Sequence, residues 1–264
     1  MTRSVLERIK MPKLSVAIIT LNEQNHIGRC IESVKDLADE IVVVDSFSTD
    51  KTKEICESYG VKFFENKFEG HIQQKNFAFD QCTGDYILSL DADEALSEQL
   101  RISIRDTLEN FQSDGYFFNR LTNYNGYWVR HCGWYPDRKL RLVKNGKARW
   151  KGTNPHDILK LDNGTKGEAL RGDLLHYSYD SISDHIQQTD RFTTIAARTL
   201  HANGKKSSRF KIAVRPVLKF LRDYLLKRGF LDGRYGLVIC FVNAFYVFLK
   251  YSKLMELQDG KEVQ

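Results

Sequence analysis

The first ninety residues alternate short apolar runs with segments of helical periodicity. Runs at 13–20, 40–45, 61–65 and 85–90 have the length and composition of short strands, of which 40–45 and 86–90 are predicted to be buried. Between them, residues 26–37 and 72–80 show the apolar spacing of helices, and Ser48 or Thr49 before Asp50 resembles a helix start. This alternation predicts βαβ units and a parallel sheet with right-handed crossovers.

Polar residues follow three of these strands at the point where each strand ends. They are Thr20, Leu21, Asn22 and Glu23 after the first strand, Asp45 and Ser46 after the second, and Asp91, Ala92, Asp93 and Glu94 after the fourth. Ligands of open α/β sheets bind at the carboxyl ends of the strands. The pattern therefore predicts a ligand site at this edge.

Asp91 and Asp93 lie on the same side of the chain while it stays extended. Two such close charges repel unless a divalent cation or a metal-bound phosphate neutralises them. The alternative is a strand end leading into a helix whose N-terminus these acids and Glu94 cap. Neither a G-x-G-x-x-G nor a P-loop motif is present, which disfavours a dinucleotide or P-loop site.

Beyond residue 94 the pattern predicts a mixed sheet and then helices. Residues 99–111 have helical spacing, 115–121 read as a strand, and Asn125-Gly126 predicts a hairpin. Residues 139–144 alternate and are followed by Asn145-Gly146, which predicts a second hairpin. From Ser181 the chain is predicted to be helical, with an exposed basic break at 204–209.

The C-terminal part mixes apolar and basic residues. Residues 210–228 have the composition of a basic amphipathic helix, and 237–249 form an apolar run with one polar interruption. That run is shorter than the ~20 residues of a transmembrane span. Two interpretations stay open: a helix packed on the domain or on a second subunit, and an anchor lying in the plane of a membrane.

Composition narrows the class of protein. The 264 residues, 42% of them hydrophobic, suffice for one sizeable domain with an annex. The net charge of +6 suits nucleotides, phosphates or an anionic membrane surface, and no nucleic-acid partner is expected. Five scattered cysteines without C-x-x-C spacing, and a polar stretch at 1–10 without a signal core, predict a cytoplasmic protein.

Several segments together resemble a known family. They are Leu14–Glu23, Glu40–Ser46, Gln74-Lys75-Asn76 and Thr83–Glu94. These four resemble the nucleotide-sugar domain of family 2 glycosyltransferases of the GT-A fold. Gly133–Arg141, Leu175–Tyr179 and Gly229–Gly233 resemble the subgroup that contains lipopolysaccharide core β-1,4-glucosyltransferases, so the likeness covers almost the whole chain.

The resemblance implies a fold and an activity. The fold would be α/β, with a Rossmann-like, mixed and mostly parallel central sheet flanked by helices. We expect a polar extension at 1–12, a catalytic domain at 13–180 with nucleotide-sugar (13–94) and acceptor (95–180) halves, and a helical region at 181–264. The activity would be inverting, metal-dependent transfer of a hexose, with UDP-glucose the favoured donor, to a saccharide of a bacterial envelope glycolipid.

The resemblance also implies roles for single residues. Asp93 would bind Mg²⁺ or Mn²⁺, Asp91 would share the metal through water or bind ribose, and His176 would be a further ligand unless it is a buried histidine bonded to the backbone. Nucleotide-sugar contacts are expected from Thr20, Leu21, Asn22, Glu23, Asp45, Ser46, Lys75, Asp91, Ala92, Trp134, Arg138 and Arg141. Lys75 could instead be solvated, and Arg138 and Arg141 could form structural ion pairs.

An inverting transfer needs a general base. Where the subgroup usually has His-Glu, this chain has His156-Asp157, which keeps a carboxylate on a shorter side chain. We expect Asp157 to be the base, with Asp137 as the second candidate. Other hypotheses are a polyprenyl-phosphate hexosyltransferase and a non-catalytic nucleotide-sugar-binding protein. The enzyme could be a homo-oligomer and could lie on the inner face of the cytoplasmic membrane.

Overall fold

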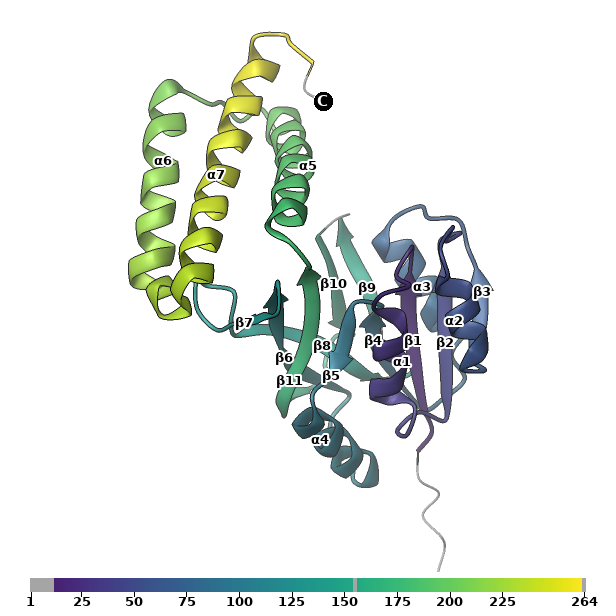
Figure 1. Ribbon diagram of the computed structural model, residues 1–264. Coiled ribbons are helices and arrows are strands. Elements are labelled where there is room, and N and C mark those ends of the chain that lie inside the picture. The colour runs from purple at the N-terminus through teal and green to yellow at the C-terminus, as the bar shows by residue number, and fades with distance from the viewer. Residues whose placement is uncertain (1–11, 154–155, 263–264) are drawn as a thin grey trace, which may run out of the picture. The chain divides into compact units, whose positions relative to one another are not determined.

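The computed structural model describes residues 12–153 and 156–262, and these residues form two compact units (Figure 1). The first unit holds the chain up to Arg120 together with Arg138–His176. The second holds Leu121–Asp137 and the chain from Tyr177 onwards. The predicted site residues of the strand ends all belong to the first unit.

The first unit begins with the predicted alternation of strands and helices. Its elements are β1 (Leu14–Thr20), α1 (Ile27–Val34), β2 (Glu40–Asp45), α2 (Thr52–Ser58), β3 (Lys62–Glu65), α3 (His71–Asp80) and β4 (Tyr86–Asp91). The β1–β2, β1–β4 and β2–β3 pairs are parallel. The βαβ prediction is thus confirmed, with element bounds close to those expected.

One helix start differs from the prediction. Helix α2 begins at Thr52, after Lys51, and not at Ser48 or Thr49. The Asp50 carboxylate accepts hydrogen bonds from the backbone and the hydroxyl of Thr52, so it satisfies a donor of the first turn. Ser48 instead hydrogen-bonds Asp45, which keeps residues 46–50 as a loop.

The remaining strands complete a mixed sheet. Further elements are β5 (Glu94–Leu96), α4 (Glu98–Glu109), β6 (Gly115–Tyr124), β7 (Tyr127–Val129), β8 (Asp137–Lys144), β9 (Ala148–Thr153), β10 (His156–Leu161) and β11 (Gly167–Tyr179). The strand order is β3-β2-β1-β4-β8-β6-β11-β5, with β7 beside β6. Strand β8 is antiparallel to β4, and β11 is antiparallel to β5. The predicted mixed α/β sheet flanked by helices is confirmed.

One of the two predicted hairpins forms. Strands β6 and β7 are antiparallel across Asn125-Gly126, whose φ angles of 50° and 82° are left-handed. The second prediction is wrong, because β9 pairs with β10 in a separate two-stranded sheet. Strand β8 already has β4 and β6 as neighbours, so it has no free edge for β9.

Hydrophobic residues pack on both faces of the parallel strands. Leu14, Val16 and Ile18 of β1 face a cluster that includes α1 and α4, whereas Ala17 faces a cluster that includes α3, β9 and β10. This alternation follows from the two-residue period of a strand. Because both faces are covered, the polar strand ends are the part of the sheet left for a ligand.

The second unit is helical from Ser181, as predicted. It contains α5 (Ile182–Ala202), α6 (Arg209–Leu221), a π-helical turn η1 (Arg222–Leu226), a 3₁₀ turn η2 (Gly229–Asp232) and α7 (Gly233–Gln258). Helix α7 packs against α5 and α6. The apolar run at 237–249 is part of this longer helix. Within the described chain, the helical stretch Gly229–Gln258 meets the length and composition of a membrane-crossing helix, although a soluble helix can meet them too.

Candidate active site

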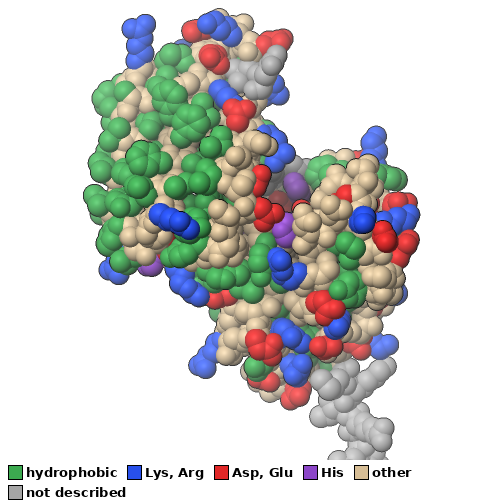
Figure 2. Space-filling model, viewed as in Figure 1, with side chains coloured by type: hydrophobic (Ala, Val, Ile, Leu, Met, Phe, Trp, Pro, Cys, Tyr) green, Lys and Arg blue, Asp and Glu red, His purple; other side chains and the backbone are tan. Residues whose placement is uncertain are grey.

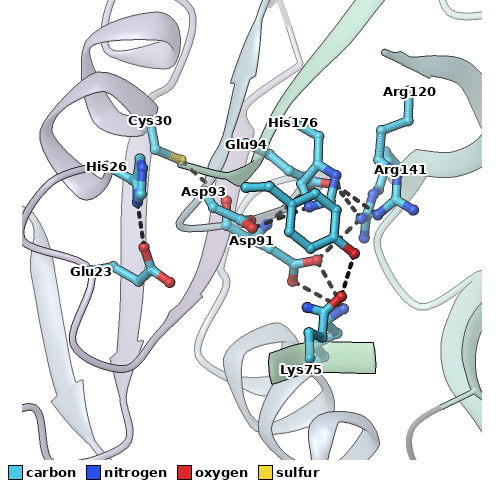
Figure 3. A network of polar contacts seen from close by, with 12 residues as sticks. Glu23, His26, Cys30, Lys75, Asp91, Asp93, Glu94, Arg120, Arg141 and His176 are labelled. Carbon is cyan, nitrogen blue, oxygen red and sulfur yellow. Dashed lines mark hydrogen bonds and ion pairs between the residues drawn. The ribbon is translucent and has the colours of Figure 1, made fainter. Parts of the chain in front are cut away.

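Carboxylates gather where β4 ends. Asp91 is the last residue of β4, Asp93 lies in the turn that follows, and Glu94 begins β5 (Figure 3). Three other elements bring partners to them: α3 carries Lys75, β8 carries Arg141 and β11 carries His176. Sheet pairing explains the position of His176, because β11 and β5 align His176 opposite Glu94.

Lys75 connects two of the predicted site carboxylates. Its ammonium lies 3.0 Å from Asp91 Oδ1 and 2.9 Å from Asp157 Oδ2. It also lies 4.2 Å from the centre of the Trp150 ring. Only 6% of the Lys75 side chain is exposed, against 26% for Asp91 and 14% for Asp157. The alternative of a solvated lysine is therefore wrong. The Lys75–Asp157 ion pair connects α3 to β10 at the end of β4.

Arg141 and Glu94 form the buried side of the same network. Arg141 Nη2 donates to Glu94 Oε1 at 2.7 Å and to Asp91 Oδ2 at 3.3 Å. Glu94 Oε2 accepts a 3.0 Å hydrogen bond from the Asp91 backbone, and Arg120 lies 3.8 Å from Glu94 Oε1. Glu94 therefore holds the turn that carries the two aspartates and does not cap a helix. Ser97 caps the next helix, α4, instead.

The charges around Asp91 fix its ionisation. Burial alone would raise the pKa of Asp91, but Lys75 and Arg141 outweigh it and hold this pKa well below its usual value. Burial likewise opposes the charge of Arg141, yet Glu94 and Asp91 raise the Arg141 pKa above its usual value. Both groups are consequently charged at neutral pH.

Asp93 and His176 form a separate pair. Asp93 Oδ2 lies 3.1 Å from His176 Nε2, and both side chains are partly exposed. No Lys or Arg is recorded in an ion pair with Asp93 within the described chain, in contrast to Asp91. The two aspartates of the sequence motif thus lie in different surroundings.

The ends of β1 and β2 form a loop pair held by hydrogen bonds. Ser46 donates its N–H to the Thr20 carbonyl, and Asn22, with a left-handed φ of 55°, accepts from the Thr49 backbone through its side chain. Asp45 is buried and its carboxylate accepts from the Ser48 backbone at 2.7 Å.

The other predicted nucleotide contacts lie in different environments. Leu21 is exposed and Ala92 is buried, and Glu23 pairs with His26 at 2.8 Å. Gln74 donates to the Ser46 hydroxyl at 3.0 Å. Thus α3 reaches the β2 end through Gln74 and the β4 end through Lys75, its next residue.

Two predicted contacts have other partners. The Arg138 guanidinium, in the first unit, lies 4.8 Å from the centre of the Phe117 ring. Trp134 belongs to the second unit, where it packs against Tyr124, Tyr179 and His185. The side chain of His156 lies outside the described part of the chain.

Several buried polar atoms near the strand ends lack a hydrogen-bond partner within the described chain. They are Thr20 Oγ1, Asp91 Oδ1, Arg141 Nε and Nη1, Trp150 Nε1 and His176 Nδ1, although Asp91 Oδ1 lies 3.0 Å from the Lys75 ammonium. Buried donors and acceptors are normally satisfied, so unsatisfied ones at one edge indicate the place of a ligand. An anion would satisfy the two guanidinium donors.

Two functional candidates, Arg120 and Trp150, were not predicted from the sequence, and Glu94 was predicted at the strand end without a site role. Arg120 and Glu94 belong to the buried network, and Trp150 lies beside both Lys75 and Arg141. The available signal for Arg120 was that it is the one charged residue of β6. No local signal identified Trp150, because an aromatic residue in a strand usually belongs to the core.

The pair of Asp93 and His176 fits a divalent cation. Neighbouring ligands of an octahedral ion bonded at about 2.1 Å lie roughly 3 Å apart, which matches the spacing of these two side chains. Across residues 12–153 and 156–262 no group of three or more His, Cys, Asp and Glu side chains is arranged to hold a metal. Such a site resembles those in which Mg²⁺ is held by one or two protein ligands and completed by substrate phosphates.

Comparison with known proteins assigns the class. The family model "Glycosyl transferase family 2" matches residues 15–157, which include the network from Lys75 to Asp157. A glycosyltransferase of Rickettsia typhi is 33% identical over 257 residues, covering 94% of this chain and 88% of the relative. The lipopolysaccharide core biosynthesis glycosyltransferase LpsC of Rhizobium meliloti is 31% identical, covering 94% of this chain and 93% of LpsC.

Among solved structures, TarS of S. aureus in complex with UDP is similar over 96% of this chain and 93% of its own, with 15% identity and a TM-score of 0.47. The family match and the extent of the relatives are decisive by themselves. The chain belongs to glycosyl transferase family 2. Its mixed sheet flanked by helices agrees with the α/β architecture that the sequence resemblance implied.

Proposed function

We propose that this glycosyltransferase transfers a hexose, glucose from UDP-glucose, to a saccharide of a bacterial envelope glycolipid such as the lipopolysaccharide core. The observation that carries the proposal is the network in which Lys75 joins Asp91 to Asp157 beside the Asp93–His176 pair. The acceptor class is supported by the likeness to LpsC along nearly the full length of both chains.

The donor would lie along the carboxyl ends of β1, β2 and β4. Residues 20–23 with Asp45 and Ser46 would contact the nucleoside, since carbonyl and carboxylate oxygens accept from imide and ribose donors. Asp91 and Ala92 would contact the ribose side of the donor. The unsatisfied guanidinium donors of Arg141 would contact the diphosphate. Arg138 and Trp134 are also proposed to contact the nucleotide sugar. Arg138 would bind one of its phosphates.

Asp93 and His176 would hold Mg²⁺ or Mn²⁺. The cation would supply positive charge at the diphosphate leaving group, where negative charge grows as the glycosidic bond breaks. Lys75 and Arg141 are already paired with Asp91, Asp157 and Glu94, so the extra positive charge that a diphosphate needs would come from the cation.

Asp157 would act as the general base. Inverting transfer requires a carboxylate that takes the proton of the acceptor hydroxyl while its oxygen attacks the sugar from the face opposite the leaving group. The contact between Lys75 and Asp157 Oδ2 holds this carboxylate close to the β4 end. Asp91 and Asp157 both contact Lys75 Nζ, at 3.0 Å and 2.9 Å. Their nearest carboxylate oxygens therefore lie close enough together for one sugar ring to reach both.

A donor screen tests the proposal first. Thermal shift with UDP, GDP and their sugars, each with and without Mn²⁺, should show the largest stabilisation with a UDP-hexose and Mn²⁺. Asp93→Asn should remove the Mn²⁺-dependent part and retain a metal-independent part. Stabilisation by GDP-sugars alone would contradict the proposed UDP donor. Equal turnover with and without a divalent cation would contradict the proposed metal dependence.

Sugar transfer with matched variants tests the base. Asp157→Asn should bind the donor like the wild type and lose transfer by 10²-fold or more, the usual scale of general base catalysis. Asp137→Asn is the matched variant at the second candidate and should retain transfer. If Asp137→Asn is inactive and Asp157→Asn is active, the general base is Asp137. A product on polyprenyl phosphate would favour that hexosyltransferase hypothesis. Donor binding without turnover on any acceptor would favour a non-catalytic binding protein.

The proposed acceptor also locates the enzyme. Envelope glycolipids are embedded in a membrane, whereas nucleotide sugars are water-soluble. We therefore propose that the enzyme works in the cytoplasm at the inner face of the cytoplasmic membrane. A homo-oligomer is a further proposal, which sedimentation of the full chain would test.

A further inference from the structure

Helix α6 of the second unit has an apolar side that nothing in the described chain covers. None of its thirteen residues is buried. Phe210, Val217 and Leu218 are 73%, 56% and 58% exposed. Their positions fall on one side of a helix, since residues three, four, seven or eight apart share a face. Ile212, Val214 and Phe220 of the same helix are partly buried, so α6 has one packed side and one exposed apolar side.

The turn between α6 and α7 carries a second group of exposed apolar side chains. Leu225 and Leu226 in η1 are 53% and 78% exposed, and Phe230 and Leu231 in η2 are 47% and 53% exposed. These four residues are called the tip here. Exposing four large apolar side chains within seven residues of one turn is unfavourable in water. The tip therefore needs an apolar environment, as α6 does.

Helix α7 continues the apolar surface. Leu237, Phe241, Phe245 and Phe248 are exposed at intervals of three or four residues. The Phe241 ring lies 4.7 Å from that of Phe220 on α6, which joins the two helices. Figure 2 shows hydrophobic side chains gathered over α6 and α7. Helix α6, the tip and this side of α7 are together called the apolar face.

Positive charge is concentrated in the same segment. Lys205–Arg234 contains ten Lys and Arg residues and two acids, Asp223 and Asp232. Both acids are buried: Lys219 and Arg222 pair with Asp223, and His131 pairs with Asp232. The segment therefore has a net charge of +8, whereas the whole chain has +6, so the remainder is slightly acidic. Exposed Lys227 and Arg228 lie in the chain between the two pairs of tip residues.

We propose that the apolar face lies in the surface of an anionic lipid bilayer, with the tip inserted among the lipids and the basic side chains paired with their headgroups. Charge complementarity selects this occupant, because apolar side chains interleaved with exposed basic ones suit the boundary between lipid chains and anionic headgroups. If a second copy of the chain covered this face, two segments that each have a net charge of +8 would be brought together. Their electrostatic repulsion disfavours that occupant.

The geometry favours a helix pair lying on the membrane over a spanning helix. Helix α7 packs along both α5 and α6, and its Lys253 is bonded to Asp190 and Thr194 of α5. A crossing would have to remove these partners from α7. This inference does not depend on the proposed sugar donor, although it would bring the enzyme to a lipid-embedded acceptor.

Vesicle binding by the full chain tests the proposal without donor or acceptor. We expect co-sedimentation with phosphatidylglycerol-containing vesicles, weak binding to pure phosphatidylcholine, and release at high salt. Leu226→Ser/Phe230→Ser should weaken binding at least tenfold. Lys227→Gln/Arg228→Asn should weaken it about 30-fold on anionic vesicles, with Asn chosen because Arg228 has a left-handed φ of 54°.

The control is Phe68→Ser/Ile102→Ser, which removes two apolar residues of the first unit that are 45% and 42% exposed and should bind like the wild type. Thermal melting followed by circular dichroism shows that each variant is folded. Unchanged vesicle binding by both tip variants would overturn the proposal. So would a stable dimer in light scattering that the tip variants dissociate, or a wild-type protein that high salt and alkaline carbonate together fail to release.

Discussion

Replacing Lys75 by Met should expose the energetic role of the buried network. The ammonium lies about 3 Å from both Asp91 and Asp157. At an effective dielectric constant of about 20, each pair attracts by roughly 5–6 kcal/mol. Desolvation of the three charges costs several kcal/mol each and cancels most of this attraction.

The expected loss of stability follows from what remains after the substitution. Removing one partner of a buried ion pair typically costs about 3–5 kcal/mol, because the other charge stays buried. Asp91 keeps Arg141 at 3.3 Å and is about a quarter exposed, so the lower end applies. We expect Lys75→Met to lower the free energy of unfolding by about 3 kcal/mol.

A double variant separates charge from packing. Lys75→Met/Asp157→Asn removes the stranded carboxylate and should recover about 1–2 kcal/mol relative to Lys75→Met alone. Urea unfolding at neutral pH measures both, with an unchanged dependence on denaturant as the sign that the two-state analysis holds.

Lys53→Met is the matched control. Lys53 pairs with Glu65 at 3.2 Å with both side chains more than 40% exposed, so its loss should cost less than about 1 kcal/mol. The reasoning is refuted if Lys75→Met costs no more than this control. It is also refuted if the double variant is no more stable than Lys75→Met.

Two further predictions concern acid stability. Burial would raise the pKa of Glu40, but bonds from Lys62, Ser15 and Thr83 lower it to about 2, so its stabilisation is present above pH 4.5 and is lost as pH falls towards 2. Glu40→Gln should remove about 3 kcal/mol at pH 7 and flatten the pH dependence of urea unfolding in that window; an unchanged slope would contradict it. Burial lowers the pKa of His185 to about 4, so the unfolded chain binds the extra proton and stability falls from pH 6.5 to 4. His185→Phe should flatten this second window, and chemical unfolding of the variant at pH 7.5, 5.5 and 4.5 shows whether it does.

The sequence determined the alternation of elements. Apolar strands between helical segments specified the order β1 to β4, because each element must bury one face or stripe of hydrophobic residues. The polar residues after three of the strands predict a ligand site at one edge of the sheet, since the carboxyl ends of parallel strands meet there. Periodicity is a local property, so a single segment is enough to show it.

Pairing between distant strands was beyond the local pattern. The turn at Asn145-Gly146 has the composition of a hairpin, yet β9 pairs with β10 because β8 is flanked on both edges. The π-helical and 3₁₀ turns that carry the tip were likewise not indicated by the interleaved basic and apolar residues.

The sequence by itself thus determined which residue types end the strands and which family the motifs resemble, because both are written in contiguous segments. Only the tertiary structure decided how the charges are shared. In the folded chain Lys75 and Arg141 pair with Asp91, Arg141 also pairs with Glu94, and His176 pairs with Asp93. These partners are 16 to 83 positions apart in the chain, and the folding of α3, β8 and β11 onto the end of β4 brings them together. The ionisation and availability of each carboxylate depend on its neighbours in space, which is why the two aspartates of one short motif acquire different environments.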